Sequence, residues 1–201
     1  MRIGLLGGTF DPIHNGHLAA AAAAQKCAGL TEVLLVPAGV PPHKDKPHAS
    51  ALDRLEMCRL AAAGTPGLGV WDLEVGRPGR SFTIDTVRAF IDQRPGDIPL
   101  LLIGWDAAVQ FRTWHRWEEL LALIEMVVFP RPGLPEPAAR DLGRAGLGGA
   151  GVILCEEVTP EVSATELRSL LTSGANLAGL VPPAVEAYIR EHGLYGSRVG
   201  G

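Results

Sequence analysis

Cysteine is scarce in this sequence, and the cysteines that it has are far apart. Three occur among the 201 residues, Cys27, Cys58 and Cys155, and none belongs to a C-x-x-C pair. An odd and scattered set argues against the disulfide framework of small secreted domains, which uses closely spaced pairs. The chain also starts with a strand-like pattern where a signal peptide would lie. We therefore expect a reducing, cytoplasmic environment.

Excess positive charge and long apolar runs are missing as well. The chain has 18 lysines and arginines against 22 aspartates and glutamates, a formal net charge of −4. It lacks the global basic field that nucleic acid would need, so any phosphate site must be local. The alanine run at 19–24 is too short and too weakly apolar to span a bilayer. We expect neither nucleic acid nor a membrane as a partner.

What the sequence does contain is an alternation of strand and helix patterns. Apolar residues make up 47% and charged residues 20%, which fits one globular domain. Apolar runs typical of strands lie at 3–6, 33–36, 68–71, 100–103, 126–129 and 152–154. Helical patterns lie near 16–28, 50–63, 83–93 and 106–124. The alternation predicts a Rossmann-like α/β fold, a doubly wound parallel sheet with helices on both faces and ligands at the carboxyl ends of its strands.

The rest of the chain predicts additions to this sheet. Two segments rich in proline, 37–50 and 130–151, indicate a mobile loop and a surface insertion. Amphipathic patterns predict a small C-terminal helical part at 163–195. We expect one domain over 1–195, with this part packed on it, and a flexible tail at 196–201.

The most informative segment is the turn between the first strand and the first helix. It reads Gly8-Thr9-Phe10-Asp11-Pro12-Ile13-His14-Asn15-Gly16-His17. Glycines at 7, 8 and 16 would let a ligand approach the backbone. Asn15 is a good N-cap, which places His17 in the first helical turn. Because the start of a helix attracts phosphate through its N–H groups and dipole, we interpret the turn as a nucleotide-phosphate site with His14 and His17 aimed into it.

Other interpretations of this turn have less support. The glycine spacing matches neither G-x-x-x-x-G-K-[ST] nor G-x-G-x-x-G. Zinc needs three or four ligands, and the other four histidines and the three cysteines are scattered, so no protein ligand for a metal is predicted. The plain alternative is two exposed histidines at a helix start.

A second motif begins the C-terminal helical part. Ser163 and Glu166 fit a capping box, S-x-x-E, which is a structural role. A capped helix start is also an anion site, where Thr165 and Arg168 would donate a hydroxyl and a guanidinium fork to phosphate oxygens. Taken alone, the motif favours capping; taken with the first turn, it favours phosphate binding.

Both motifs resemble one enzyme family. The first turn resembles the G-x-F-D-P-x-H-x-G-H signature of bacterial cofactor adenylyltransferases in the nucleotidyltransferase superfamily, and 162–168 resembles their late I-S-S-T-x-x-R motif. The middle of the chain resembles the nicotinate-nucleotide adenylyltransferases in 41–44, 81–86, 103–106 and 113–117. With 180–185 and 193–195 also similar, the likeness runs almost end to end. Ala164, which lacks a hydroxyl usual in the late motif, and Trp105, which replaces a small residue, depart from the pattern.

The resemblance implies adenylyl transfer from ATP to nicotinate mononucleotide, which gives nicotinate adenine dinucleotide and pyrophosphate in NAD biosynthesis. The attacking phosphate is already anionic, so catalysis needs positioning and charge stabilisation rather than a protein nucleophile. The resemblance also implies Mg²⁺ on the phosphates, with few protein ligands and a weak sequence trace. A homo-oligomer is left open.

The resemblance further implies a role for individual residues. The expected catalytic residues are His14, His17 and Arg168. The ATP site adds Gly8, Thr9, Phe10, Ser163 and Thr165. The acceptor site consists of Lys44, Thr83, Asp106, Trp114 and His115. Here the Trp114 ring stacks on the pyridine, whose carboxylate meets Thr83 and the backbone N–H of His115, while Asp106 contacts the ribose. The plain alternatives are a helix-capping Thr83, a core Trp114 and a solvated Lys44, and for Asp11 we favour a structural role in the turn.

Other functions share parts of this pattern. Nicotinamide mononucleotide is an alternative acceptor, and only the resemblance favours the acid. Phosphopantetheine adenylyltransferases share both end motifs but are shorter and lack a segment like 113–117. A nucleotide sensor without turnover would not need intact His14, His17 and Arg168. An RNA ligand-charging domain fits poorly with the acidic balance of the chain.

Overall fold

The computed structural model describes residues 1–41, 46–130, 139–148, 151–157, 160 and 162–197. In these residues it contains a sheet of six parallel strands in the order β3-β2-β1-β4-β5-β6. The strands are β1 Arg2–Gly8, β2 Glu32–Pro37, β3 Leu68–Val70, β4 Ile98–Gly104, β5 Glu125–Phe129 and β6 Val152–Leu154. Each overlaps one of the predicted apolar runs, so the predicted parallel sheet is confirmed.

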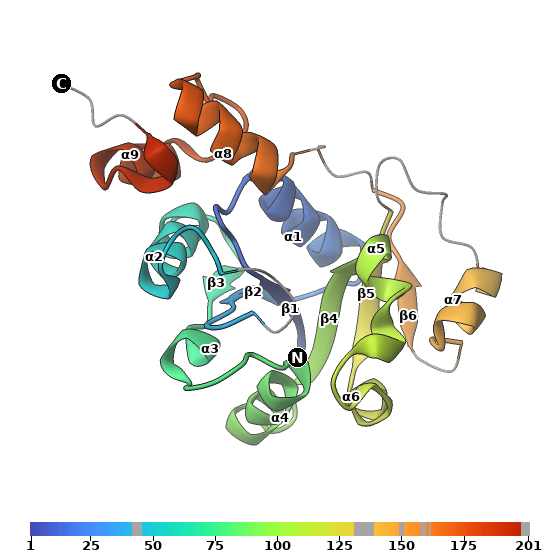
Figure 1. Cartoon of the computed structure of the whole chain (residues 1–201). Coiled ribbons are helices and arrows are strands. Elements are labelled where there is room, and N and C mark those ends of the chain that lie inside the picture. The colour runs from blue at the N-terminus through green and yellow to red at the C-terminus, as the bar shows by residue number, and fades with distance from the viewer. Residues whose placement is uncertain (42–45, 131–138, 149–150, 158–159, 161, 198–201) are drawn as a thin grey trace.

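Helices cover both faces of this sheet (Figure 1). They are α1 Asn15–Cys27, α2 Ala51–Ala62, α3 Leu73–Gly76, α4 Thr83–Gln93, α5 Trp105–Ala108, α6 Trp117–Leu123, α7 Ala139–Ala145, α8 Ala164–Ser173 and α9 Pro183–Glu191, with the 3-10 turns η1 Phe111–Thr113 and η2 Leu194–Gly196. One buried cluster lies between the sheet and α1, α2, α8 and α9, and a second lies between the sheet and α4 to α7. Along β2, Val33 and Leu35 enter the first cluster, while Leu34 and Val36 enter the second. This alternation is why the strands are apolar on both sides.

The strand order places a crevice beside β1. Its neighbours are β2, which the chain reaches through α1, and β4, which continues toward the opposite edge through α5 and α6. In a doubly wound sheet such a switch point leaves room for a ligand at the carboxyl ends of the strands. Here those ends are Gly8 and Gly104.

The helix predicted over 106–124 is wrong, because three short pieces occupy this segment. Between them, Trp114 is extended, and Arg116 has a left-handed backbone with φ 54° and ψ 43°. A left-handed residue cannot continue a right-handed helix, so a new helix starts at Trp117. The break turns Trp114 toward the crevice. The sequence reasoning also missed α3, which is only four residues long.

The C-terminal elements pack on the sheet domain through α2 and α1. The Tyr188 hydroxyl on α9 donates to Oδ1 of Asp53 on α2 over 3.0 Å. Ser197 is buried, and its hydroxyl donates to the carbonyl of Ile189. The packed chain therefore extends two residues beyond the predicted boundary at 195, while 198–201 lie outside the described residues. No helix in the described part of the chain is long and apolar enough to cross a bilayer.

Candidate active site

The turn that follows β1 is filled partly by its own side chains. Phe10 has a left-handed backbone, with φ 49°, and its buried ring lies over Gly8. A Cβ at Gly8 would lie 2.8 Å from Cζ of Phe10, whereas nothing lies within 4 Å of a Cβ at Gly7. A Cβ at Gly16 would lie 3.0 Å from the His14 ring and 3.2 Å from the Pro160 carbonyl. Of the three glycines, only Gly7 has open space where a Cβ would lie, although Gly8 and Gly16 also line the larger cleft with their backbone.

The start of α1 is capped differently from the prediction. His14, not Asn15, is the N-cap residue, with extended backbone angles. Asn15 instead donates from Nδ2 to the carbonyl of Gly179 over 2.8 Å and from its backbone N–H to Leu180 over 2.9 Å. The reason is that the segment before α9 closes on the helix start and takes these donors. The helix therefore offers fewer N–H groups to phosphate than the sequence suggested, although His17 does lie in the first turn.

The two histidines form a stacked pair. Their ring centroids are 3.7 Å apart at an interplanar angle of 27°, and the edge of the Phe10 ring lies 4.9 Å from the His17 centroid. Nδ1 of His17 accepts the backbone N–H of His14 over 3.2 Å. A neutral His17 therefore carries its proton on Nε2, which makes Nε2 a hydrogen-bond donor. His17 lines the crevice, and the buried His14 supports it from behind.

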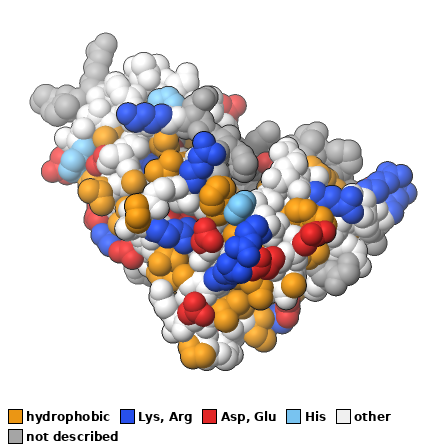
Figure 2. All heavy atoms as spheres, turned by 60° about the horizontal axis from the view of Figure 1, so that its bottom comes forward, with side chains coloured by type: hydrophobic (Ala, Val, Ile, Leu, Met, Phe, Trp, Pro, Cys, Tyr) orange, Lys and Arg blue, Asp and Glu red, His pale blue; other side chains and the backbone are white. Residues whose placement is uncertain are grey.

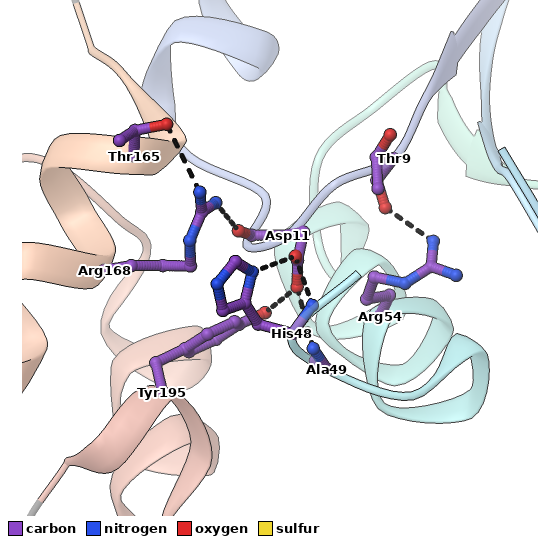
Figure 3. Close-up of polar contacts among 8 residues, drawn as sticks. All are labelled: Thr9, Asp11, His48, Ala49, Arg54, Thr165, Arg168 and Tyr195. Carbon is purple, nitrogen blue, oxygen red and sulfur yellow. Dashed lines mark hydrogen bonds and ion pairs between the residues drawn. The ribbon is translucent and has the colours of Figure 1, made fainter. Parts of the chain in front are cut away.

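The motif at the start of α8 contacts this turn directly. Arg168 donates from Nη1 to the Asp11 carbonyl over 2.7 Å and from Nη2 to Oγ1 of Thr165 over 3.2 Å (Figure 3). Ser163 is the N-cap residue, but its hydroxyl accepts no capping hydrogen bond, so the predicted capping box with Glu166 does not form. Because Arg168 donates to a carbonyl 157 residues away, it joins the two motifs rather than stabilising its own helix alone.

Asp11 joins several segments of the site. Its carboxylate accepts the backbone N–H groups of His48 (2.8 Å) and Ala49 (3.0 Å) and the hydroxyl of Tyr195 (2.9 Å), as Figure 3 shows. Burial raises the pKa of this carboxyl, but the donors from His48, Ala49 and Tyr195 outweigh burial, and the pKa lies below its ordinary value. Asp11 thus has the structural role favoured from the sequence, although these partners come from other segments.

Arg54, on α2, is buried against the backbone of the turn after β1. Its side chain is only 1% exposed, and it donates from Nη1 to the Thr9 carbonyl over 2.6 Å and from Nη2 to the Gly39 carbonyl over 3.1 Å. A buried guanidinium fixes both backbone segments and adds positive charge behind the turn. The sequence reasoning missed Arg54, since nothing in the residues around it distinguishes it from a surface arginine.

Two cavities meet at the end of β1. A cleft of about 1040 Å³ is lined, among others, by Gly8, Thr9, Phe10, His17, Asp106, Trp114, Thr165 and Arg168. A pocket of about 250 Å³ is lined, among others, by Gly8, Thr9, Glu74, Thr83, Thr86, Trp114 and His115. Gly7, Gly8, Thr9 and Trp114 belong to both walls. Of the predicted site residues, His14 and Ser163 line neither cavity, and Lys44 lies outside the described residues.

The smaller pocket is aromatic with one buried carboxyl. The Trp114 ring packs 5.3 Å from Phe111, and the rings of Phe82 and His115 are 4.4 Å apart. Glu74, which the sequence reasoning missed, accepts the Thr86 hydroxyl over 2.5 Å. Burial raises the pKa of Glu74, and the hydroxyls of Thr86 and Ser81 oppose that effect only in part. A flat ring with polar substituents is the kind of ligand that such a pocket fits.

The larger cleft suits an anion. Its wall includes His17 and Arg168, and also Lys46 and His48. The sequence reasoning did not single out Lys46 and His48, although both lie in the lysine- and histidine-rich loop at 37–50. On the face of the molecule in Figure 2, basic and acidic side chains are interspersed. The lining of the cleft is mixed as well, since Asp11 and Asp106 lie there beside Lys46 and Arg168. Among the described residues, no three His, Cys, Asp or Glu side chains gather as a metal site.

The doubly wound fold, with two cavities at its switch point, is that of a nucleotide-binding protein. The model of the cytidylyltransferase-like family matches residues 5–170, and the chain belongs to this family.

Curated relatives place the chain among the nicotinate-nucleotide adenylyltransferases of that family. Three proteins named "Probable nicotinate-nucleotide adenylyltransferase" illustrate the match. The one from Pseudomonas fluorescens is 47% identical over 207 residues, covering 96% of this chain and 97% of the relative. That from Aeromonas hydrophila is 43% identical over 207 residues, covering 96% of each. That from Symbiobacterium thermophilum is 43% identical over 198 residues, covering 96% of this chain and 95% of the relative.

Solved structures show the same fold at low identity. The nicotinic acid mononucleotide adenylyltransferase of Plasmodium falciparum, complexed with NaAD, superposes with a TM-score of 0.81 at 18% identity over 99% of both chains. The same protein complexed with APC gives a TM-score of 0.80 at 17% identity over 99% of both chains.

Proposed function

We propose that the chain transfers the adenylyl group of ATP to nicotinate mononucleotide, which gives nicotinate adenine dinucleotide and pyrophosphate. The observation that carries this proposal is the shared wall of the two cavities. The larger cleft has the volume and the donors for a nucleoside triphosphate, and the smaller pocket has an indole face for a pyridine ring. Both open at Gly7, Gly8 and Thr9, where the acceptor phosphate would meet the α-phosphorus of ATP. The names of the relatives support this choice of acceptor.

The proposed mechanism uses positioned charge. An oxygen of the acceptor phosphate forms a bond to the α-phosphorus while the bond from phosphorus to pyrophosphate breaks. No proton has to be removed from the attacking group, so a general base is unnecessary. Nε2 of His17 and the guanidinium of Arg168 donate to the transferring and leaving phosphates, where negative charge grows. His14 and Asp11 hold these two donors in place.

The acceptor contacts follow from the smaller pocket. Thr83 and His115 line it and would receive the pyridine carboxylate, while Asp106 lines the larger cleft beside Trp114, where the ribose would lie. Lys44 remains a predicted phosphate contact of the loop.

The cleft also fits a triphosphate that arrives with a divalent metal, Mg²⁺ in our proposal. Its wall supplies donors for phosphate oxygens, and the described residues gather no carboxylate cage, so His17, Lys46 and Arg168 would hold the phosphates that carry the ion. When bound, the ion neutralises charge on the triphosphate.

Pyrophosphate release in the presence of ATP and Mg²⁺ tests this function. Nicotinate mononucleotide, its amide analogue and phosphopantetheine are compared in parallel, and we expect a clear preference for the first. A preference for the amide would keep the reaction but overturn the acceptor contacts. Release with none of the three, despite measurable ATP binding, would favour a nucleotide sensor and contradict the proposal.

A further inference from the structure

Tyr195, close to the end of the described chain, reaches into the candidate active site (Figure 3). Its hydroxyl donates to Oδ1 of Asp11 over 2.9 Å, across 184 positions of sequence. Its backbone is left-handed, with φ 58° and ψ 25°, a conformation that is uncommon for a bulky residue. Strained backbone of this kind persists only where the surrounding contacts impose it, and it gathers at functional sites.

Asp11, which accepts the Tyr195 hydroxyl, contacts residues on two sides of the larger cleft. The Asp11 carboxylate holds the loop at His48 and Ala49, and the Asp11 carbonyl holds the guanidinium of Arg168. The Tyr195 hydroxyl and the Ala49 N–H share the same oxygen, Oδ1. A carboxylate that loses one of these donors can turn, and the loop at His48 and Ala49 would move with it. The turn that presents the Asp11 carbonyl to Arg168 would lose the same tether, so the position of Arg168 would loosen as well.

Tyr195 is also close to the helix that carries Arg168. Oγ1 of Thr172, on α8, lies 3.2 Å from the Tyr195 carbonyl and 3.0 Å from the Arg168 carbonyl. A cavity of about 530 Å³, lined by Tyr195 and Thr172, shares His48, Thr165 and Arg168 with the larger cleft. The residue therefore spans the gap between the phosphate turn and α8.

The Tyr195 hydroxyl acts as a constant donor. Burial raises its pKa, and the charge of Asp11 raises it further, so the hydroxyl stays protonated at neutral pH. Its contribution is a fixed hydrogen bond and not a proton transfer.

We infer that Tyr195 is a positioning residue for adenylyl transfer: through Asp11 it fixes Arg168 and the loop at His48 where the cleft receives the triphosphate. This inference rests on the proposed function. It makes the C-terminal segment part of the nucleotide site, although the segment lies far from the two phosphate motifs in sequence. Tyr195 touches no reacting atom in this role.

The other tyrosine of the chain is a matched control. Tyr188 belongs to the same C-terminal part and also donates to an aspartate, Asp53, over 3.0 Å. Neither Tyr188 nor Asp53 lines any of the three cavities. Tyr188→Phe and Tyr195→Phe each delete one such hydroxyl and keep the ring, so the two variants separate positioning from stability.

The test measures steady-state kinetics, binding of a non-hydrolysable ATP analogue and the melting midpoint for the full-length wild type and both variants. We expect Tyr195→Phe to lower kcat/KM for ATP about tenfold, to weaken analogue binding, and to leave the KM of the acceptor nearly unchanged. The melting midpoints of Tyr188→Phe and Tyr195→Phe should fall by similar amounts, since each variant loses one hydrogen bond to an aspartate. Tyr188→Phe should keep wild-type kinetics. Equal kinetics in the two variants, or a Tyr195→Phe effect that appears only in the melting midpoint, would overturn the inference.

A second comparison tests the route through Asp11. If Tyr195 acts through Asp11, the Tyr195→Phe change should have little further effect on analogue binding in an Asp11→Asn background. Full additivity would contradict this route. Binding of the ATP analogue needs no acceptor, so it tests the role of Tyr195 even if the protein releases no pyrophosphate. Absence of pyrophosphate release would count against the proposed function and not against the role of Tyr195.

Discussion

His17 is the side chain whose chemistry is most constrained by its neighbours. Its Nδ1 is occupied by the His14 N–H, its ring is stacked on His14, and it lines the cleft. Because Nδ1 accepts this hydrogen bond, a neutral His17 carries its proton on Nε2, and in the proposed mechanism that Nε2–H donates to phosphate. A donor aimed at developing charge is worth more in the transition state than in the bound substrate, so its loss should appear mainly in kcat.

His17→Ala should therefore lower kcat by about 10²-fold, the size seen when one such donor is removed. Since His17 is only partly buried, the melting midpoint should change little. Initial rates of pyrophosphate release and a thermal melt measure the two effects. His14→Ala is the contrasting variant: His14 is 7% exposed, so this change should cost more stability. A His17→Ala protein that melts early and keeps its turnover would refute the assignment.

Glu74 gives a prediction of pH dependence. Burial raises its pKa above the ordinary 4.5, so the folded state binds its proton more tightly than the unfolded state does. This contribution to stability is complete below about pH 4.5 and is lost as the pH rises through the folded pKa. Melting midpoints of the wild type relative to Glu74→Gln should therefore fall between pH 4.5 and neutrality. A difference that stays constant across this range would show that the carboxyl keeps its ordinary pKa.

Sequence reasoning reached some residues of the site and not others for a physical reason. His17, Thr165 and Arg168 stand in short motifs whose local geometry, a turn and a helix start, can be inferred from neighbouring residues. Arg54 and Tyr195 contact distant backbone or side chains, and local pattern does not show these contacts, although 193–195 is one of the segments that resemble the family. The N-cap of α1 was misassigned for the same reason, because Gly179 and Leu180 take the donors of Asn15.

At the scale of elements, the strands were predictable and the segment between β4 and β5 was not. Strands buried on both faces leave an unbroken apolar run, which local sequence shows directly. The segment from α5 to α6 has helical spacing, but its course is set by the left-handed Arg116 and by the packing of Trp114 against Phe111. Tertiary contacts have overridden the local preference. The result is one indole, Trp114, at the cavities and another, Trp117, that lines neither cavity and packs against the second buried cluster.

Because of this arrangement, mutation of Trp114 and mutation of Trp117 should have different effects. Trp114 lines both cavities, whereas Trp117 lines neither and lies under the guanidinium of Arg112 at 5.6 Å. Trp114→Ala should raise the KM of nicotinate mononucleotide by about tenfold, the size of a lost stacking contact, and the KM of ATP by less. Trp117→Ala should lower the melting midpoint and leave both KM values unchanged. Equal changes in the two KM values for Trp114→Ala would remove the support for stacking.

At the scale of the whole molecule, the site is assembled from both ends of the chain. The sheet supplies the crevice, but the segment before α9 holds the start of α1, and η2 holds Asp11. Composition and periodicity predicted that the C-terminal helices pack on the domain. The contacts show that α8 also lines the larger cleft, through Ala164, Thr165 and Arg168. Removing them should therefore affect function more than loss of a peripheral appendage would.

Truncation after His192 tests this coupling. It removes Tyr195 and the buried Ser197 but keeps all six strands and α9. We expect a folded protein with a lower melting midpoint and a loss in kcat/KM for ATP at least as large as that of Tyr195→Phe, because the same hydrogen bond to Asp11 is lost together with its packing. Truncation after Ser197 keeps the contacts that η2 makes within the described residues and should behave as the wild type. Circular dichroism establishes that the sheet is retained, and pyrophosphate release measures activity. A protein that ends at His192 and turns over ATP normally would show that the cleft is complete without the C-terminal segment.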